Sequence, residues 1–292
     1  MDEHDDYYWL AQRFEEHRSH LRAVAYRMLG SLSEADDAVQ EAWLKLSRSE
    51  TSAIENLNGW LTTVIGRVCL DVLRSRKSRR EESLEAHVPD LIVSRENGMD
   101  PEQEALVADS IGIALFVVLE TLAPAERLAF VLHDMFAVPF EEIASIVGCS
   151  SNAARQLASR ARRRVRGAAA TPDVDLKQQR RVVDAFFAAV RNGDFDALIA
   201  VLDPDVVVRS DHGTVREIRG ARVAAEGAFM FSHLAQWVQP VLVNGAAGIV
   251  SRLANGKIFA IMCFTVKGNT IAEMDVIRNS DRLHRLDLTD LN

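Results

Sequence analysis

The sequence predicts a multidomain chain in which two all-α domains precede one α+β domain. Its 292 residues exceed the usual length of a single domain. Apolar residues recur at helical spacing through most of residues 7–167, whereas runs of β-branched residues appear only in the last 117 residues. Helices followed by a series of strands are typical of an all-α part joined to an α+β part.

The composition is that of an ordinary globular protein, with 48% hydrophobic and 26% charged residues. The first residues, MDEHDDYYWLAQRFEEHRSH, are acidic and lack the apolar segment of a signal peptide. No apolar run is long enough to cross a bilayer. Cys69, Cys149 and Cys263 are scattered without metal-ligand spacing, which favours reduced thiols. We therefore expect a cytoplasmic protein without a metal or cofactor.

Charge is distributed unevenly along a chain whose net charge is −8. Residues 1–167 carry 20 lysine and arginine against 27 aspartate and glutamate residues, and residues 168–292 carry 14 against 15. Neither part is basic as a whole. Contacts with nucleic acid must therefore come from local basic patches, and the acidic remainder suits a basic partner surface.

The first predicted domain covers residues 1–85. Apolar residues between Phe14 and Leu29 recur at helical spacing and predict a helix. A second helix starts within GSLSEADDAVQEAWLKL, where Ser33 is the expected N-cap and acidic residues occupy the first turn.

A loop and a long helix complete this domain. The polar stretch 47–59 predicts the loop, and the apolar spacing after it predicts a helix from about Gly59 to Lys77. The helix ends in the basic sequence RSRKSRR, residues 74–80. Residues 86–106 show no steady period and are expected to form a linker.

Residues 107–167 form the second predicted domain, which ends in a helix-turn-helix. The segment FEEIASIVGCSSNAARQLASRARRRV divides into helix, tight turn and helix. Gly148 permits the left-handed conformation of the turn, and Ser150 or Ser151 can cap the second helix. The buried positions are expected to be Ile143, Ala144 and Val147 in the first helix and Ala154, Leu157, Ala158, Ala161 and Val165 in the second.

The second of these helices contains six arginines within residues 154–167. The second helix of such a motif enters the major groove with its N-terminal residues on base edges. Asn152, Arg155 and Gln156 are therefore the candidate base readers, and the later arginines suit phosphate contacts. The full candidate set is Ser151, Asn152, Arg155, Gln156, Arg160, Arg162 and Arg163. A solvated amphipathic helix is the alternative, but it would not require the preceding turn.

The last domain, residues 177–292, follows a short linker at 168–176. It begins with the helical segments QQRRVVDAFFAAVRNG and DFDALIAVL. DVVVRS then predicts a strand, a helix is expected near 220–235, and β-rich segments follow. This order predicts the α+β domain.

Two motifs in the all-α part resemble a known family. DDAVQEAWLKL and GWLTTVIGRVCLDVLRSRKSRRE resemble region 2 of the extracytoplasmic-function (ECF) sigma-70 factors. LETLAPAERLAFVLHDMFAVPFEEIASIVGCSSNAARQLASRARRRV resembles region 4 of the same factors. The resemblance covers about residues 7–167. It implies a protein that performs no reaction itself, binds core RNA polymerase, recognises −35 and −10 promoter elements and starts transcription.

The resemblance also implies how this part docks on polymerase. The region-2-like helix is expected to bind the clamp helices of the β′ subunit, and region 4 the β flap. The docking residues are expected to be Asp36, Asp37, Gln40 and Glu41. An acidic exposed face is compatible with a basic partner, although a merely solvated acidic face would look the same in sequence.

The −10 element is assigned by the resemblance to the helix that ends in RSRKSRR. Promoter opening requires the protein to hold unstacked bases and the backbone beside them, which needs positive charge and base-binding pockets. The charge is supplied by Arg67, Arg74, Arg76, Lys77, Arg79 and Arg80. Asn56 and Asn58 in the preceding loop are candidates for holding a flipped base, whereas Trp60 is expected in the core. The alternative is a solvated basic helix end.

The C-terminal part resembles a SnoaL-like domain of the nuclear-transport-factor-2-like superfamily. The resemblance is carried by RRVVDAFFAAVRNGDFDALIAVLDPDVVVRSD and VREIRGARVAAEGA. ECF factors with this extension form the SigJ-type group. Two segments depart from that group: HVPD at 87–90 stands in place of a WLP tripeptide, and DHGTVRE at 211–217 in place of a Gly-rich stretch.

The SnoaL-like resemblance implies a cone with an apolar pocket. Asp211, His212, His233 and Asp275 are the candidate polar groups in that pocket, but they form no catalytic motif. We expect a regulatory or ligand-sensing domain, with an unknown small ligand as a candidate partner, and no enzyme. Two alternatives stay open: a helix-turn-helix regulator that never touches polymerase, and a DNA-binding module fused to a small-molecule-binding or enzymatic domain.

Overall fold

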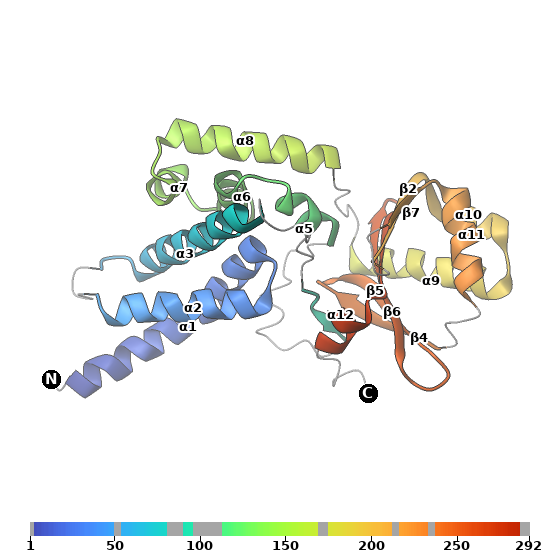
Figure 1. Ribbon diagram of the computed structural model, residues 1–292, viewed down its shortest axis with the longest axis horizontal. Coiled ribbons are helices and arrows are strands. Elements are labelled where there is room, and N and C mark those ends of the chain that lie inside the picture. The colour runs from blue at the N-terminus through green and yellow to red at the C-terminus, as the bar shows by residue number, and fades with distance from the viewer. Residues whose placement is uncertain are drawn as a thin grey trace. The chain divides into compact units, whose positions relative to one another are not determined.

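The computed structural model forms two compact units (Figure 1). The residues it describes are 3–49, 54–80, 90–95, 113–168, 175–211, 216–232 and 237–286. The first unit is helical and holds the described residues up to Asp90 and those from Phe116 to Ala168. The second unit contains the sheet and holds the remaining described residues, including 91–95.

Three helices form the first half of the helical unit: α1 (Glu3–Leu29), α2 (Leu32–Ser47) and α3 (Leu57–Arg80). Leu21, Leu46 and Ile65, one from each helix, are completely buried in their shared core. Gly30 joins α1 to α2 with a positive φ of 71°, which glycine adopts without steric cost.

The start of α2 differs from the expectation that Ser33 is its N-cap. Ser31 occupies the N-cap position but makes no side-chain capping bond. Instead the Leu32 N–H donates to the Asp90 carboxylate at 2.9 Å, and the Asp90 N–H donates to the Gly30 carbonyl at 2.8 Å. The cap thus comes from a residue 58 positions away, which no local sequence pattern reveals.

The second half of the helical unit contains the helix-turn-helix. Its elements are α5 (Ile113–Glu120), α6 (Pro124–Phe130), a π-helical segment (Val131–Met135), α7 (Phe140–Val147) and α8 (Ser151–Ala168). Gly148 takes φ 80° and its N–H donates to Ala144 at 2.9 Å, which closes α7 and turns the chain. Of the two expected caps, Ser150 accepts a hydrogen bond from the Ala153 N–H at 3.2 Å.

The buried faces of the motif agree with the expected ones at most positions. Buried are Ile143 and Ala144 on α7 and Ala154, Ala158, Ala161 and Val165 on α8. Leu157 and Val147 are only half-buried, and Ile146 is buried in place of Val147. A Cβ atom on Gly66 of α3 would lie 3.3 Å from the Ile146 side chain, so α3 covers this face of α7.

The second unit is built on a seven-stranded sheet in the order β1-β4-β5-β6-β7-β2-β3. Its strands are β1 (Val93–Ser94), β2 (Leu202–Ser210), β3 (Arg216–Arg219), β4 (Trp237–Val243), β5 (Ala246–Arg252), β6 (Ile258–Lys267) and β7 (Thr270–Ile277). Its helices are α9 (Leu176–Asn192), α10 (Phe195–Ala200), α11 (Ala221–Ser232) and α12 (Ser280–Arg285). Neighbouring strands are antiparallel except β2 and β7, which are parallel.

Two apolar clusters lie on opposite faces of this sheet. α9, α10 and α11 pack on one face (Figure 1). Phe186, Leu198 and Phe264 are buried together there. On the other face Leu91 and Leu283 pack against alternate residues of the same strands. Side chains of a strand point alternately to the two faces, so this arrangement decides which polar residues reach a cavity.

The edge strand β1 comes from the segment that was expected to be a linker. Val93 pairs with Val243 and Ser94 with Leu242. The Ile92 N–H donates to the Asn244 side chain at 2.9 Å, and the Asn244 N–H donates to the Ile92 carbonyl at 2.8 Å. A two-residue strand shows no periodicity, and its partners lie about 150 residues later in the chain, so the sequence predicts only a linker here.

Candidate nucleic-acid and polymerase interfaces

The basic helix α8 presents an exposed polar face opposite its buried alanines. Asn152, Arg155, Gln156 and Arg163 are exposed on it, and Ser151 is half-buried at its first turn. Asn152, Arg155 and Gln156 lie at the start of the helix, directly after the turn. This is where the recognition helix of a helix-turn-helix contacts base edges. The expected base readers therefore lie together on an accessible surface.

Arg155 is held on this face by weak contacts. Its guanidinium donates to Asn152 at 3.2 Å, pairs with Glu141 at 3.3 Å and lies 5.5 Å from the centre of the Phe140 ring. The side chains of Arg155 and Glu141 are both more than half exposed, so this ion pair contributes little to stability. Exchange of these contacts for a base edge is therefore energetically inexpensive.

Three other arginines of α8 form ion pairs within the domain, although Arg160 and Arg164 stay exposed. Arg160 and Arg164 pair with opposite oxygens of Glu126, at 2.9 and 2.7 Å, and Arg162 pairs with Asp134 at 2.7 Å. Glu126 is buried on α6, so these pairs fasten α8 to the helices beneath it. Arg163 has no ion pair within the described part of the chain. The sequence does not distinguish these arginines from one another, because the partner Glu126 lies 34 residues before Arg160 and no local pattern reveals the pair.

The expected −10 residues on α3 also fall into different environments. Arg74 and Lys77 are exposed, with Asp71 at 3.8 Å from Arg74. Arg67 donates to the Ser145 carbonyl at 3.3 Å. The side chains of Arg79 and Arg80 lie outside the described residues, although both belong to α3.

Arg76 serves the packing of the domain. Its side chain is only 14% exposed and forms an ion pair with Glu34 of α2. It also donates to the carbonyl of Leu29 at the end of α1, at 2.9 Å. Arg76 thereby joins the three helices of this half of the unit.

The two asparagines expected in the loop before α3 have separate positions, since Asn56 precedes the helix and Asn58 belongs to it. The Asn56 side chain accepts a hydrogen bond from the Gly59 N–H at 3.1 Å and so caps α3. Asn58 is exposed in the first turn, and Trp60 is half-buried. Residues 50–53 of the preceding loop lie outside the described residues.

The expected polymerase-binding residues form one exposed face of α2: Asp36, Asp37, Gln40 and Glu41. The opposite face is buried and apolar. Asp36 pairs with Arg22 of α1 at 2.6 Å, which ties it to the fold. Glu41 pairs with Lys45 at 3.5 Å through two half-exposed side chains, so this carboxylate stays accessible.

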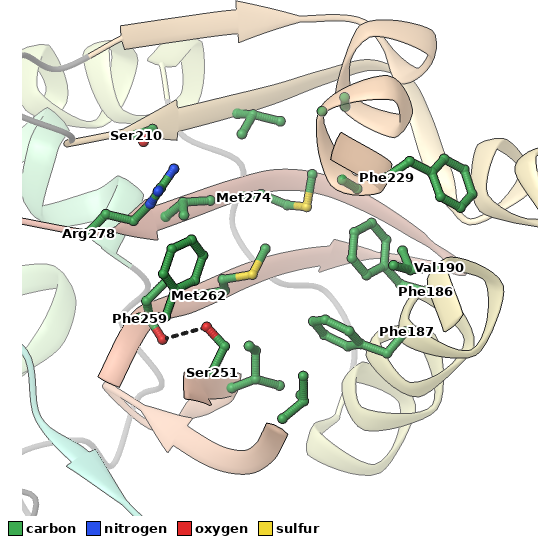
Figure 2. A pocket seen from close by; sticks show the side chains of 18 of the residues that line it. Phe186, Phe187, Val190, Ser210, Phe229, Ser251, Phe259, Met262, Met274 and Arg278 are labelled. Carbon is green, nitrogen blue, oxygen red and sulfur yellow. Dashed lines mark hydrogen bonds between the residues drawn. The ribbon is translucent and has the colours of Figure 1, made fainter. Parts of the chain in front are cut away.

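The second unit contains a cavity of about 900 Å³ between its sheet and the helices α9 and α11 (Figure 2). Apolar side chains, chiefly phenylalanine, valine, methionine, isoleucine and alanine, form most of its wall. The two carboxylates expected in the pocket, Asp211 and Asp275, do not line it. The strand neighbours Met274 and Val276 line the cavity, and Asp275 points to the opposite face of the sheet. Residues 212 and 233, the two expected histidines, lie outside the described residues.

Asp211 and Asp275 instead organise the fold. Asp211 accepts hydrogen bonds from the N–H groups of Arg278 and Asn279 at 2.6 and 3.0 Å and pairs with Arg282 at 2.5 Å. Asp275 is buried 3.5 Å from Arg209, which also pairs with Glu273 at 2.9 Å. Burial raises the pKa of Asp275 to about 6, against the opposing charge of Arg209.

Two further features bear on function. Within the described residues, no group of three or more histidine, cysteine, aspartate or glutamate side chains could hold a metal ion. The described helices include none that is long and apolar enough to cross a membrane.

Comparisons with known proteins agree with the two helical domains. The model of sigma-70 region 2 matches residues 13–79, and that of sigma-70 region 4 matches residues 113–165. A probable ECF RNA polymerase sigma factor, SigI of Mycobacterium tuberculosis (strain CDC 1551 / Oshkosh), is 33% identical over 285 residues, which cover 95% of this chain and 94% of the relative. SigJ of M. tuberculosis (strain ATCC 25618 / H37Rv), an ECF RNA polymerase sigma factor, is 42% identical over 214 residues. These residues cover 71% of this chain and 68% of SigJ.

The whole fold matches a solved relative as well. The crystal structure of the M. tuberculosis extracytoplasmic function sigma factor SigJ aligns with a TM-score of 0.75 and 34% identity. The alignment covers 94% of this chain and 98% of that one. The chain therefore belongs to the ECF RNA polymerase sigma factors of the sigma-70 family, in the SigJ-type group with a C-terminal SnoaL-like domain.

Proposed function

We propose that this ECF sigma factor reads the −35 element with the exposed face of α8. Asn152, Arg155 and Gln156 make the base contacts, and Arg163 binds phosphate. The observation that carries the proposal is the division among the arginines of α8. Arg160 and Arg164 pair with the buried Glu126, and Arg162 pairs with Asp134. The Arg155–Glu141 pair instead joins two exposed side chains, and Arg163 is exposed with no ion pair among the described residues.

The −10 element is bound at the C-terminal half of α3 and the residues before that helix. Arg74 and Lys77 supply exposed positive charge for the backbone beside the unstacked bases. Arg79 and Arg80 extend the same basic sequence. Arg67 joins this surface when its hydrogen bond to region 4 opens.

Docking on core polymerase uses the exposed acidic face of α2. Asp37, Gln40 and Glu41 bind the basic clamp helices of β′, and Asp36 contributes from its ion pair with Arg22. Region 4 binds the β flap. The protein acts in the cytoplasm with the polymerase.

The C-terminal SnoaL-like domain modulates this activity and catalyses no reaction. Support comes from β1, because Val93 and Ser94, between regions 2 and 4, pair with β4 of the C-terminal sheet. A conformational change at this edge of the sheet would therefore move the segment between region 2 and region 4.

The test is run-off transcription with purified core RNA polymerase, with the full chain as the reference. Asn244→Ala removes the side-chain acceptor of the Ile92 N–H and should change promoter-dependent output at fixed protein concentration. Asn255→Ala, in an exposed turn of the same domain, is the control. Equal output from all three proteins would contradict modulation through β1, and no output from any of them would contradict the docking and promoter assignments.

A further inference from the structure

The cavity of the second unit has chemically different ends. At one end the rings of Phe186, Phe187 and Phe229 face it from α9 and α11 (Figure 2). Its volume of about 900 Å³ lies within the range of small-molecule sites. An apolar wall of this size suits a ligand with an extended hydrocarbon or aromatic body.

The other end gathers polar groups. Figure 2 shows Ser210 and Arg278 together there, away from the rings of Phe186, Phe187 and Phe229, whereas the Phe259 ring lies beside Arg278. Arg216 lines the cavity beside them because it is the cross-strand partner of Ser210 in the antiparallel pair of β2 and β3. Ser210 pairs in register with Val276 of β7, and Arg278 follows Val276 by two residues. The side chains of Ser210, Val276 and Arg278 therefore lie on one face of the sheet.

The electrostatics of this end favour an anion. Arg278 is half-buried, and its guanidinium lies 4.4 Å from the centre of the Phe259 ring. Burial lowers the pKa of Arg278, against the opposing charge of Asp211. Among the described residues that line the cavity none is acidic, and the third arginine, Arg191, is exposed on α9. A bound anion could form charge-assisted hydrogen bonds with the arginines at this end.

The middle of the cavity can adapt to the shape of a ligand. Met262 and Met274 lie between the polar end and the phenylalanine rings (Figure 2). Methionine side chains are unbranched and flexible, and they fill irregular gaps around apolar ligands.

We propose that this cavity binds an amphipathic monocarboxylate, such as a medium-chain fatty acid. The carboxylate lies against Arg278, Ser210 and Arg216, and the apolar chain runs past the methionines toward Phe186. This assignment names a ligand class for the C-terminal domain. It does not depend on the promoter or polymerase assignments, because binding is measured on the isolated full chain.

Calorimetric titration of the full chain with decanoate and with 1-decanol at neutral pH tests the proposal. Decanoate should bind at least about tenfold more tightly, since only the carboxylate forms charge-assisted bonds with arginine. Arg278→Gln should abolish that preference and leave the affinity for decanol unchanged, whereas Arg278→Lys should retain part of it. Arg219→Gln, on β3 but outside the cavity wall, is the matched control.

A second variant tests the location. Gly227 of α11 lines the cavity, and a Cβ atom there would meet nothing within 4 Å. Gly227→Phe should therefore project a ring into the cavity, weaken binding of both probes and leave the circular dichroism spectrum unchanged. Equal affinity of wild type for the two probes, absence of decanoate binding at millimolar concentration, or full binding by Gly227→Phe would each overturn the proposal.

Discussion

The guanidinium of Arg67 in region 2 donates a hydrogen bond to the carbonyl oxygen of Ser145 in region 4, with 3.3 Å between the two atoms. Beside it, Gly66 packs against Ile146 and Leu132. A residue proposed to bind the −10 element is thus held by the helix-turn-helix domain. In this packing of α3 on α7, one nitrogen of the exposed Arg67 guanidinium is engaged by region 4.

Replacement of Gly66 by leucine should separate these helices. A Cβ atom at this position would lie 3.3 Å from the Ile146 side chain, so the larger side chain has no room. We expect a longer distance between α2 and α8 and a loss of about 1–3 kcal/mol in the free energy of unfolding. Ser75→Leu, at an exposed position of α3, should change neither quantity by a comparable amount.

The distance can be measured between spectroscopic labels on cysteines that replace Lys45 and Ser159, both of which are exposed. The half-buried Cys149 is replaced by serine in all of these proteins. An unchanged distance in the Gly66→Leu protein would show that α3 and α7 do not depend on this close approach.

Arg155→Ala and Arg163→Ala should weaken promoter binding in different ways. Arg155→Ala should cost about 1–3 kcal/mol and relax the sequence preference at one −35 position, because bidentate base contacts discriminate between bases. Arg163→Ala should weaken binding to all sequences alike and reduce the salt dependence by about one phosphate contact. Fluorescence anisotropy over a range of salt concentrations and −35 sequences distinguishes the two. Identical, sequence-independent losses would contradict this division of roles.

Charge reversal on α2 should abolish docking on polymerase. Asp37→Lys combined with Glu41→Lys reverses the exposed face and leaves the Arg22–Asp36 ion pair intact. We expect the double variant to fold normally but to elute separately from core polymerase in gel filtration. A double variant at Glu16 and Glu55, two exposed acidic residues elsewhere, should still co-elute. Retention of wild-type affinity by the α2 variant would exclude this face as the docking site.

The free energy of unfolding should decrease as the pH rises from about 4 to about 6, because of the titration of Asp275. Its pKa in the folded protein is raised from 3.8 to about 6 by burial, so the folded state binds the proton more tightly than the unfolded state. The protonated form is the more stable one, and its advantage is lost as the pH rises through the folded pKa. The full shift corresponds to roughly 3 kcal/mol.

Urea unfolding of the wild type and of Asp275→Asn across this pH range measures the effect. Asparagine cannot ionise, so the variant should lack this component of the pH dependence and be the more stable protein at pH 7. Asp184→Asn, at an exposed position of α9, should behave as the wild type does. The same pH profile in the Asp275→Asn protein would place the titration elsewhere.

Local patterns in the sequence were sufficient to predict the order of the domains and the helix-turn-helix. Gly148 needs its left-handed conformation whatever surrounds it, and the apolar spacing around it defines two helices that must bury one face each. The region 2 and region 4 motifs, read in order, also led to the correct family. These properties depend on residues near one another in the chain.

Tertiary structure alone decided which partners the charged and polar side chains find. Glu126 engages Arg160 and Arg164, Asp90 caps α2, and Asn244 holds the segment that becomes β1. Each pairing joins residues 34 or more positions apart. The face of Asp275 likewise followed from strand register, since a shift of one residue moves a side chain to the other side of a sheet. Periodicity in the sequence predicts which residues share one face of a helix or strand. Only the packed fold determines which charged residue from a distant segment lies against that face.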